Sequence, residues 1–159
     1  MKQENININY ERLSYSEIGQ ELRTLYEKAL DAGGKAYSPY SNFKVGAAVK
    51  LENGKIITGN NQENSAYPSG LCAERVAVFY ANSFYPDVPV TDLFIIAINS
   101  ENDITENPVT PCGSCRQVLR ETEVRYRKKI NIFLAGKQEI IKFIGVLPLL
   151  PLAFDNDSL

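Results

Sequence analysis

The chain has 159 residues, enough for one domain built around a single core. Seventeen basic and nineteen acidic residues leave a net charge of −2, which argues against a protein whose main partner is a phosphate backbone. The apolar runs are too short to cross a bilayer, and residues 1–12 are too polar for a secretory signal. We therefore expect a cytoplasmic protein that binds neither membranes nor nucleic acid.

The predicted helices begin at capping signals. Ser14 and Glu17 have the spacing of a capping box, and apolar residues then recur at helical spacing, which predicts a helix over 15–36. Thr110 and Pro111 predict the start of a later helix, because proline is favoured at the first helical position.

Turn signals separate the predicted strands. Asn53-Gly54 is a strong hairpin signal, because both residues tolerate positive φ. The run from 91 to 99 is almost continuously apolar, which is typical of a central strand buried on both faces. Only Gly136-Lys137-Gln138 separates the last two strands, so they must be antiparallel.

In chain order, the sequence predicts a helix at 15–36, strands at 45–51 and 55–60, a helix at 72–85, a strand at 91–99, a helix at 111–124, and strands at 130–135 and 139–144. This order predicts a three-layer α/β/α fold, with helices on both faces of a five-stranded mixed sheet whose last two strands form an antiparallel hairpin. We expect a single domain over 15–159, preceded by an N-terminal extension over 1–14.

Histidine is absent, and cysteine occurs only at positions 72, 112 and 115. The chain therefore cannot form a Ser-His-Asp triad, a Cys-His pair or an imidazole metal ligand. The cysteines stand where two predicted helices begin, and the partial positive charge of a helix N-terminus favours the thiolate. Three thiolates leave one coordination position for water, as in catalytic zinc sites.

Two charged residues follow the first cysteine. Arg75 is three residues beyond Cys72, on the same helical face, and is the natural hydrogen-bond donor to the sulfur atoms. Glu74 lies in the first helical turn, where a carboxylate beside a zinc-bound water can accept its proton and pass it on. These residues predict metal-assisted hydrolysis.

Other interpretations of the same residues remain open at this point. A Cys-X-X-Cys pair is also the motif of a thiol-disulfide oxidoreductase, although Pro111 stands where such motifs favour an aromatic residue. Cys72 alone fits a small buried hydrophobic residue, and Glu74 with Arg75 fits a solvated helix face. A structural zinc module is a further alternative.

Taken together, Cys72-Ala73-Glu74 and Pro111-Cys112-Gly113-Ser114-Cys115 resemble the signature of zinc nucleobase deaminases, in which cysteine can replace the first histidine ligand. From about residue 17 to 157 the chain resembles the short, homotetrameric cytidine deaminases of pyrimidine salvage. The resemblance implies a cytidine deaminase-like fold, one Zn²⁺ per subunit bound by Cys72, Cys112 and Cys115, and a homotetramer acting on a nucleoside.

The resemblance also implies substrate contacts. The run 40–48 is similar to the family's first-strand signature, in which Phe43 would pack on the pyrimidine ring. Asn61 and Glu63 would hold the ribose hydroxyls, and the backbone N–H of Ala73 would contact the base carbonyl. Phe154, in the apolar C-terminal segment, would reach a neighbouring subunit's site.

The reaction implied for this chain is hydrolytic deamination of cytidine or 2′-deoxycytidine to the uridine product and ammonia. A zinc-bound hydroxide attacks C4 of the ring, while Glu74 carries protons first to N3 and then to the departing amino group. Arg75 would draw negative charge from the sulfur atoms.

Two related deaminases are alternatives. Blasticidin S-type deaminases share the run Pro-Cys-Gly-X-Cys-Arg-Gln but resemble this chain less at 61–64 and at Arg75. Polynucleotide-editing deaminases usually have histidine as first ligand and helix-linked final strands. The basic cluster Arg125, Arg127, Lys128 and Lys129 fits a cation-rich helix end better than a nucleic-acid site.

Overall fold

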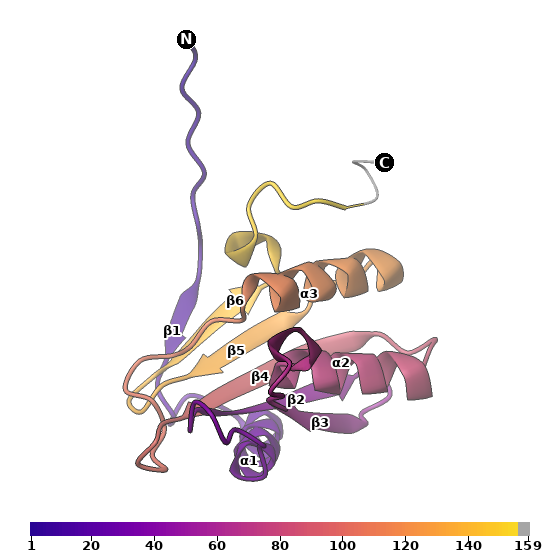
Figure 1. The fold of residues 1–159 in the computed structure, drawn as a ribbon. Helices are drawn as coiled ribbons and strands as arrows, with labels where there is room; N and C mark the ends of the chain where they lie inside the picture. Colours follow the sequence, from indigo (N-terminus) through magenta and orange to yellow (C-terminus); the bar gives the residue numbers. More distant parts are fainter. Residues whose placement is uncertain (156–159) are drawn as a thin grey trace.

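The computed structural model describes residues 1–155, so the last four residues of the predicted domain lie outside the described part. Within it, one sheet is covered by helices on both faces (Figure 1). The helices are α1 (Gln20–Gly34), α2 (Ala73–Phe84) and α3 (Gly113–Tyr126). The strands are β1 (Glu11–Leu13), β2 (Lys44–Leu51), β3 (Ile56–Asn60), β4 (Val90–Ile98), β5 (Asn131–Ala135) and β6 (Ile140–Ile144).

The strand order is β1-β6-β5-β4-β2-β3. β4 and β5 are parallel, the other neighbours are antiparallel, and β5 with β6 forms the predicted final hairpin. The three-layer mixed-sheet prediction is therefore confirmed, but the described residues contain six strands rather than five. The additional strand is β1, which pairs Glu11 with Lys142 and belongs to the segment expected to be an N-terminal extension.

Two helices begin later than predicted. Ser14 and Glu17 do form the capping-box contacts, with the backbone N–H and hydroxyl of Ser14 each donating to Glu17 Oε2 at 2.7 Å. These contacts close a separate turn, because Gly19 is extended at φ −70° and ψ 171° and is the N-cap of α1. Similarly, α3 begins after Pro111, with Cys112 as its N-cap.

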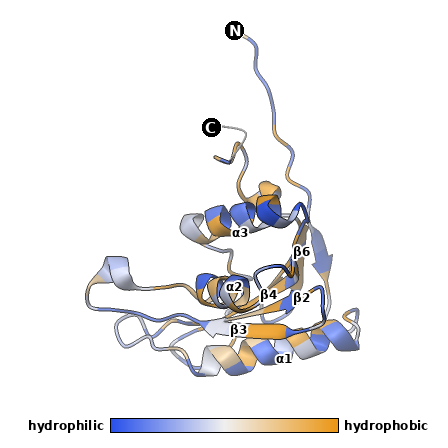
Figure 2. Ribbon diagram, turned by 90° about the vertical axis from the view of Figure 1, so that its right-hand side faces the viewer, coloured by the Kyte–Doolittle hydropathy of each residue, from blue (hydrophilic) through white to orange (hydrophobic). Residues whose placement is uncertain are grey.

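The core has one part on each face of the sheet. Leu25 and Ala29 of α1 pack with Phe94 of β4 on one face, whereas Ala77 of α2 and Leu119 of α3 pack on the other. Each helix carries both hydrophilic and hydrophobic residues (Figure 2), as expected for helices with one buried face. In residues 1–155, no helix combines the length and hydrophobicity needed to span a membrane.

Glycines allow both helix layers to approach the sheet closely. A Cβ atom at Gly46 of β2 would lie 1.9 Å from the carbonyl oxygen of Ala29 in α1. A Cβ atom at Gly59 of β3 would lie 2.5 Å from the carbonyl oxygen of Ala73 in α2. Gly59 therefore determines how deeply the first turn of α2 sits on the sheet.

Candidate metal and catalytic site

The three cysteines converge at the N-termini of two helices. Cys72 is the N-cap of α2 and Cys112 is the N-cap of α3, and the two helices start at the same end of the sheet (Figure 1). The Sγ atom of Cys112 lies 3.6 Å from that of Cys72 and 3.5 Å from that of Cys115. All three sulfur atoms lie within 4.8 Å of one another.

This arrangement fits a zinc ion. Tetrahedral zinc with Zn–S bonds of about 2.3 Å requires sulfur atoms about 3.8 Å apart, close to the observed separations. The donor set is three thiols, a set that zinc accepts when a fourth position is left for water or substrate. The site can therefore hold one ion with three protein ligands.

The pKa values of Cys72 and Cys115 are shifted in opposite directions. The pKa of Cys72 is lowered to about 5, first by a hydrogen bond from the Cys115 thiol, against the effect of burial, and further by Cys112 and Arg75. The pKa of Cys115, which is fully buried, is raised by the same hydrogen bond with Cys72 and by burial. The cluster thus stabilises a negative sulfur atom that a cation can bind in place of the protons.

Arg75 lies beside this cluster. Its guanidinium donates a hydrogen bond to Cys72 and adds a favourable charge interaction, and both lower the pKa of that thiol. Its Nε atom is buried and has no hydrogen-bond partner in the described residues. Arg75 therefore supplies positive charge next to the thiolates.

Glu74 is a buried carboxyl group in the first turn of α2, with only 5% of its surface exposed. Burial, together with the negative charge of Cys72, raises its pKa to about 6, while its own backbone N–H, the Cys115 thiol and Arg75 partly oppose the shift. A carboxyl group with a pKa this near neutrality can both accept and release a proton during a reaction.

A cavity of about 550 Å³ opens beside Cys72 and Arg75. This volume is within the usual range for small-molecule sites. Its walls combine the apolar surfaces of Tyr40, Tyr67 and Leu71 with polar groups. The cavity can therefore receive a small molecule with an aromatic part and hydroxyl groups next to Cys72.

Asn61 and Glu63, two predicted substrate residues, line this cavity. The Asn61 side chain also ties the start of β2, because Oδ1 accepts from the Val45 N–H at 2.7 Å and Nδ2 donates to the Phe43 carbonyl at 2.9 Å. Glu63 accepts from the hydroxyl of Ser41 and from the backbone N–H of Tyr40 at 2.9 Å.

These contacts keep Glu63 charged. The hydroxyl of Ser41, followed by the backbone N–H of Tyr40, holds the pKa of the Glu63 carboxyl below its usual range. Both predicted substrate residues therefore also support the cavity wall.

The other predicted substrate residues are placed differently. Ala73 is fully buried at the first position of α2. Phe43, which is half-buried, and Phe154 are not among the described residues that line the cavity. Phe154 is 61% exposed, and its carbonyl accepts a hydrogen bond from Gln117 Nε2 at 2.7 Å. The structure thus brings together Cys72, Arg75, Asn61 and Glu63 at the cavity. Among the described residues, Ala73, Glu74 and the two phenylalanines do not line it.

Sequence reasoning missed several residues that build the site. The Tyr40 and Tyr67 rings, with centroids 6.3 Å apart, form one wall, and Tyr67 lies in a polar loop with no pattern that predicts this role. Arg116 fixes the chain entering α3, because Nε donates to the Pro111 carbonyl at 2.7 Å and Nη1 to the Leu149 carbonyl at 2.8 Å. The sequence signal that could have indicated this role is the position of Arg116 directly after Cys115, the second cysteine of the Cys-X-X-Cys motif.

Comparison with known sequences identifies a family of zinc enzymes. The family model for the cytidine and deoxycytidylate deaminase zinc-binding region matches residues 20–130, which include all three cysteines. A cytidine deaminase from Halalkalibacterium halodurans is 39% identical over 87% of this chain and 98% of that protein. One from Sporosarcina psychrophila is 38% identical over 87% of this chain and 95% of that protein.

Solved structures agree with the sequence comparison. The cytidine deaminase from Burkholderia pseudomallei superposes with a TM-score of 0.71 at 35% identity, covering 83% of this chain and 98% of that one. The cytidine deaminase from Mycobacterium tuberculosis gives a TM-score of 0.62 at 30% identity, covering 84% of this chain and 97% of that one.

Proposed function

Because this chain belongs to the cytidine and deoxycytidylate deaminase family, we propose that its cysteine cluster, Glu74 and the adjoining cavity perform the deamination of cytidine or 2′-deoxycytidine. The enzyme is a zinc-dependent hydrolase whose products are the uridine nucleoside and ammonia. One observation carries the assignment of residues: a buried carboxyl with a pKa of about 6 lies in the same helical turn as the Cys72 thiolate.

Cys72, Cys112 and Cys115 are the proposed ligands of one zinc ion per subunit, because their sulfur atoms already lie at suitable separations. When bound, zinc lowers the pKa of water and so supplies a nucleophile at neutral pH. Arg75 balances the negative charge of the thiolates, which would otherwise weaken the ion as a Lewis acid.

Glu74 is the proposed proton carrier. Its carboxyl accepts a proton from the attacking water, donates it to N3 of the ring, and moves a second proton to the leaving amino group. Its raised pKa makes both directions accessible near neutrality, and its burial keeps the protons from exchanging freely with solvent.

The cavity residues are the proposed substrate contacts. Asn61 and Glu63 would bind the ribose hydroxyls, because both border the cavity and offer neutral and charged hydrogen-bonding groups. The backbone N–H of Ala73 would contact the base carbonyl, and Phe43 would pack on the pyrimidine.

A homotetramer is the proposed assembly. Phe154 is exposed and outside the cavity of its own chain, which supports a role in a neighbouring subunit's site. On α2, the rings of Tyr80 and Phe84 stack with centroids 5.7 Å apart, and both side chains are mostly exposed. Aromatic residues are enriched at protein–protein interfaces, so this exposed pair also supports contact with another subunit.

We place the enzyme in pyrimidine salvage, since it would recover uridine from a free nucleoside. A site made of three thiols requires a compartment that keeps them reduced, which supports a cytoplasmic location. The blasticidin S-type deaminase, the thiol-disulfide oxidoreductase and the structural zinc module are not favoured by the comparisons.

The test mixes purified protein with cytidine and, separately, with 2′-deoxycytidine and follows ultraviolet absorbance and ammonia, with zinc measured on the same sample. We expect about one zinc per chain and release of equal amounts of uridine and ammonia. A protein that holds zinc but leaves both cytidine and deoxycytidine unchanged would overturn the proposal.

A further inference from the structure

The N-terminal strand lies at an open edge of the sheet. β1 pairs with β6 on one side and ends the strand order, so its other backbone edge faces no strand in the described residues. Residues 1–9 precede it, are exposed along their whole length and run beyond the sheet (Figure 1). We call residues 1–13 the arm. An exposed edge of this kind is a template for pairing with another chain.

Next to β1, the side chains of the arm alternate as in a strand. The ring of Tyr10 contacts that of Phe143 with centroids 5.6 Å apart, which continues the β1–β6 register by one residue. Arg12 lies over the Tyr10 ring, 5.7 Å from its centroid, as residues two apart on one face do. Continued over residues 4–9, which precede β1, this alternation places Glu4, Ile6, Ile8, Tyr10 and Arg12 on one face.

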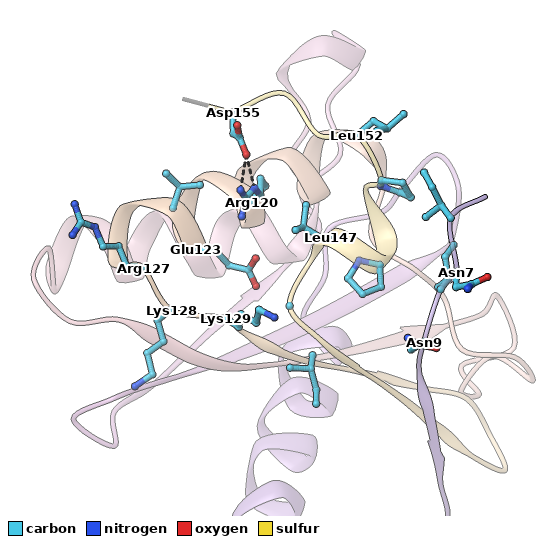
Figure 3. Close-up of a pocket in the computed structure, with 17 residues that line it drawn as sticks. Asn7, Asn9, Arg120, Glu123, Arg127, Lys128, Lys129, Leu147, Leu152 and Asp155 are labelled. Carbon is cyan, nitrogen blue, oxygen red and sulfur yellow. Dashed lines mark hydrogen bonds and ion pairs between the residues drawn. The ribbon is translucent and has the colours of Figure 1, made fainter. Parts of the chain in front are cut away.

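The apolar side chains of this face are only partly covered by the rest of the chain. Ile6, Ile8 and Tyr10 are 59%, 50% and 49% exposed. Figure 3 shows the arm passing beside the C-terminal segment that carries Leu147 and Leu152. Three apolar residues in a row on one exposed strand face form a stripe that a partner strand can bury.

The stripe is complementary to itself when two arms pair antiparallel about Ile8. Ile8 then faces Ile8 of the second copy, Ile6 faces Tyr10, and Glu4 faces Arg12 at both ends of the pairing. Apolar pairs and opposite charges directly across two strands stabilise an antiparallel pair.

Other registers lose this complementarity. A two-fold axis at Asn7 places Lys2 opposite Arg12, and like charges in facing positions are unfavourable. An axis at Asn9 places Ile6 opposite Arg12 and removes the ion pair with Glu4. The order of apolar and charged residues in the arm therefore favours a two-fold axis at Ile8 over an axis at Asn7 or Asn9.

We propose that the arm is a docking surface for a second copy of this chain, whose own arm adds an antiparallel strand centred on Ile8. Such a two-fold interface is self-complementary by construction. Within one chain Glu4 pairs with Lys2 at 2.8 Å and Arg12 pairs with Glu139. Both pairs are solvent-exposed on at least one side, so exchanging them for contacts between copies costs little.

Site-directed cross-linking tests the register with the zinc-loaded full chain. Residues facing each other across an antiparallel pair have Cα atoms about 4.5–5.5 Å apart, within reach of a disulfide. Ile8→Cys should therefore give a cross-linked dimer with oxidised glutathione. In Asn5→Cys, the two new cysteines would be about 20 Å apart at ~3.3 Å per residue, and the yield should equal that of the unaltered chain.

The mass in solution is the second measurement. By light scattering at tens of micromolar protein, Ile8→Lys should halve the mass of the assembly, because it places two like charges at the axis. Asn7→Lys adds the same charge to the other face, opposite Asn9, and should keep the mass. Neither residue lies in the cysteine cluster or lines the cavity beside it, so zinc content per chain should stay the same, and a failure here is distinct from a failure of the proposed reaction.

Three results would overturn the proposal. The first is equal cross-linking of Asn5→Cys and Ile8→Cys, which would indicate contacts without a register. The second is an unchanged mass for Ile8→Lys. The third is an equal loss of mass for Asn7→Lys, which would indicate that the face centred on Ile8 has no special role.

Discussion

The contact of Gly59 with α2 links the sheet to the metal site, and Gly59→Ala tests that link. The added Cβ would lie 2.5 Å from both the Ala73 carbonyl oxygen and the Ala77 nitrogen, and 3.0 Å from the Val76 Cβ. Ordinary contact begins near 3.4 Å, so the first turn of α2 must retreat by about 0.9 Å. The N-cap of that helix is Cys72.

The size of this shift sets the expected effect. Functional zinc sites hold their ligand distances within about 0.2 Å, so a retreat of this size misplaces Cys72 relative to Cys112. We expect zinc affinity to fall by about 10- to 100-fold, the range found when the supports of metal ligands are altered. Overpacking adds about 1–3 kcal/mol of destabilisation, which lowers Tm by about 2–4 °C per kcal/mol in a chain of this size.

The assay is zinc titration with a competing chelator, together with thermal unfolding of the metal-loaded and metal-free protein. Gly34→Ala is the matched control, because a Cβ there meets nothing within 4 Å at the end of α1. The control should keep zinc affinity and Tm. If Gly59→Ala also keeps both, the inference that β3 positions the metal site through α2 is wrong.

Three further changes test individual groups. Glu74→Gln should retain zinc and lose at least ~10²-fold in kcat, as general acid–base groups do; full activity would exclude the proton-carrier role. Cys112→Ala should lower zinc content below one ion per chain, and unchanged content would exclude it as a ligand. Burial raises the pKa of Tyr15 to about 12, and its hydroxyl donates to the Gly136 carbonyl at 2.6 Å. The resulting stability is present below pH 10, the pKa of an unfolded tyrosine, and is lost as pH rises through 12. Between pH 10 and pH 12, the urea midpoint of Tyr15→Phe should therefore fall less steeply than that of the unaltered protein. An equally steep fall in both proteins would contradict the assignment of this pH dependence to Tyr15.

Local signals predicted most of the fold. The hairpin of β2 and β3 follows from Asn53-Gly54, and that of β5 and β6 from a link too short for any other connection. The convergence of the cysteines was predicted from motif spacing and helix starts. Each hairpin depends on residues that are close together in the sequence, and the cysteine site depends on a motif already known from other proteins.

The features that were missed depend on distant contacts. β1 has only three residues, and its pairing of Glu11 with Lys142 joins segments more than a hundred positions apart. The wall formed by Tyr40 and Tyr67 arises where two loops meet. The start of α1 was placed too early because the Ser14–Glu17 contacts, although formed, close a turn that Gly19 separates from the helix.

The proposed metal ligands Cys72 and Cys112 also occupy positions where helices are normally capped, which would link metal binding to folding. Cys72 and Cys112 are N-caps that make no side-chain capping hydrogen bond, whereas serine at such a position stabilises a helix by about 0.5–2 kcal/mol over an uncapped one. Removing zinc with a chelator should therefore increase hydrogen exchange in the first turns of α2 and α3 more than in α1, whose N-cap is Gly19. Cys72→Ser should weaken zinc binding yet make the metal-free protein more stable than the metal-free parent, because the new hydroxyl can cap α2. If the metal-free variant is instead less stable than its parent, capping and ligation do not compete at this residue.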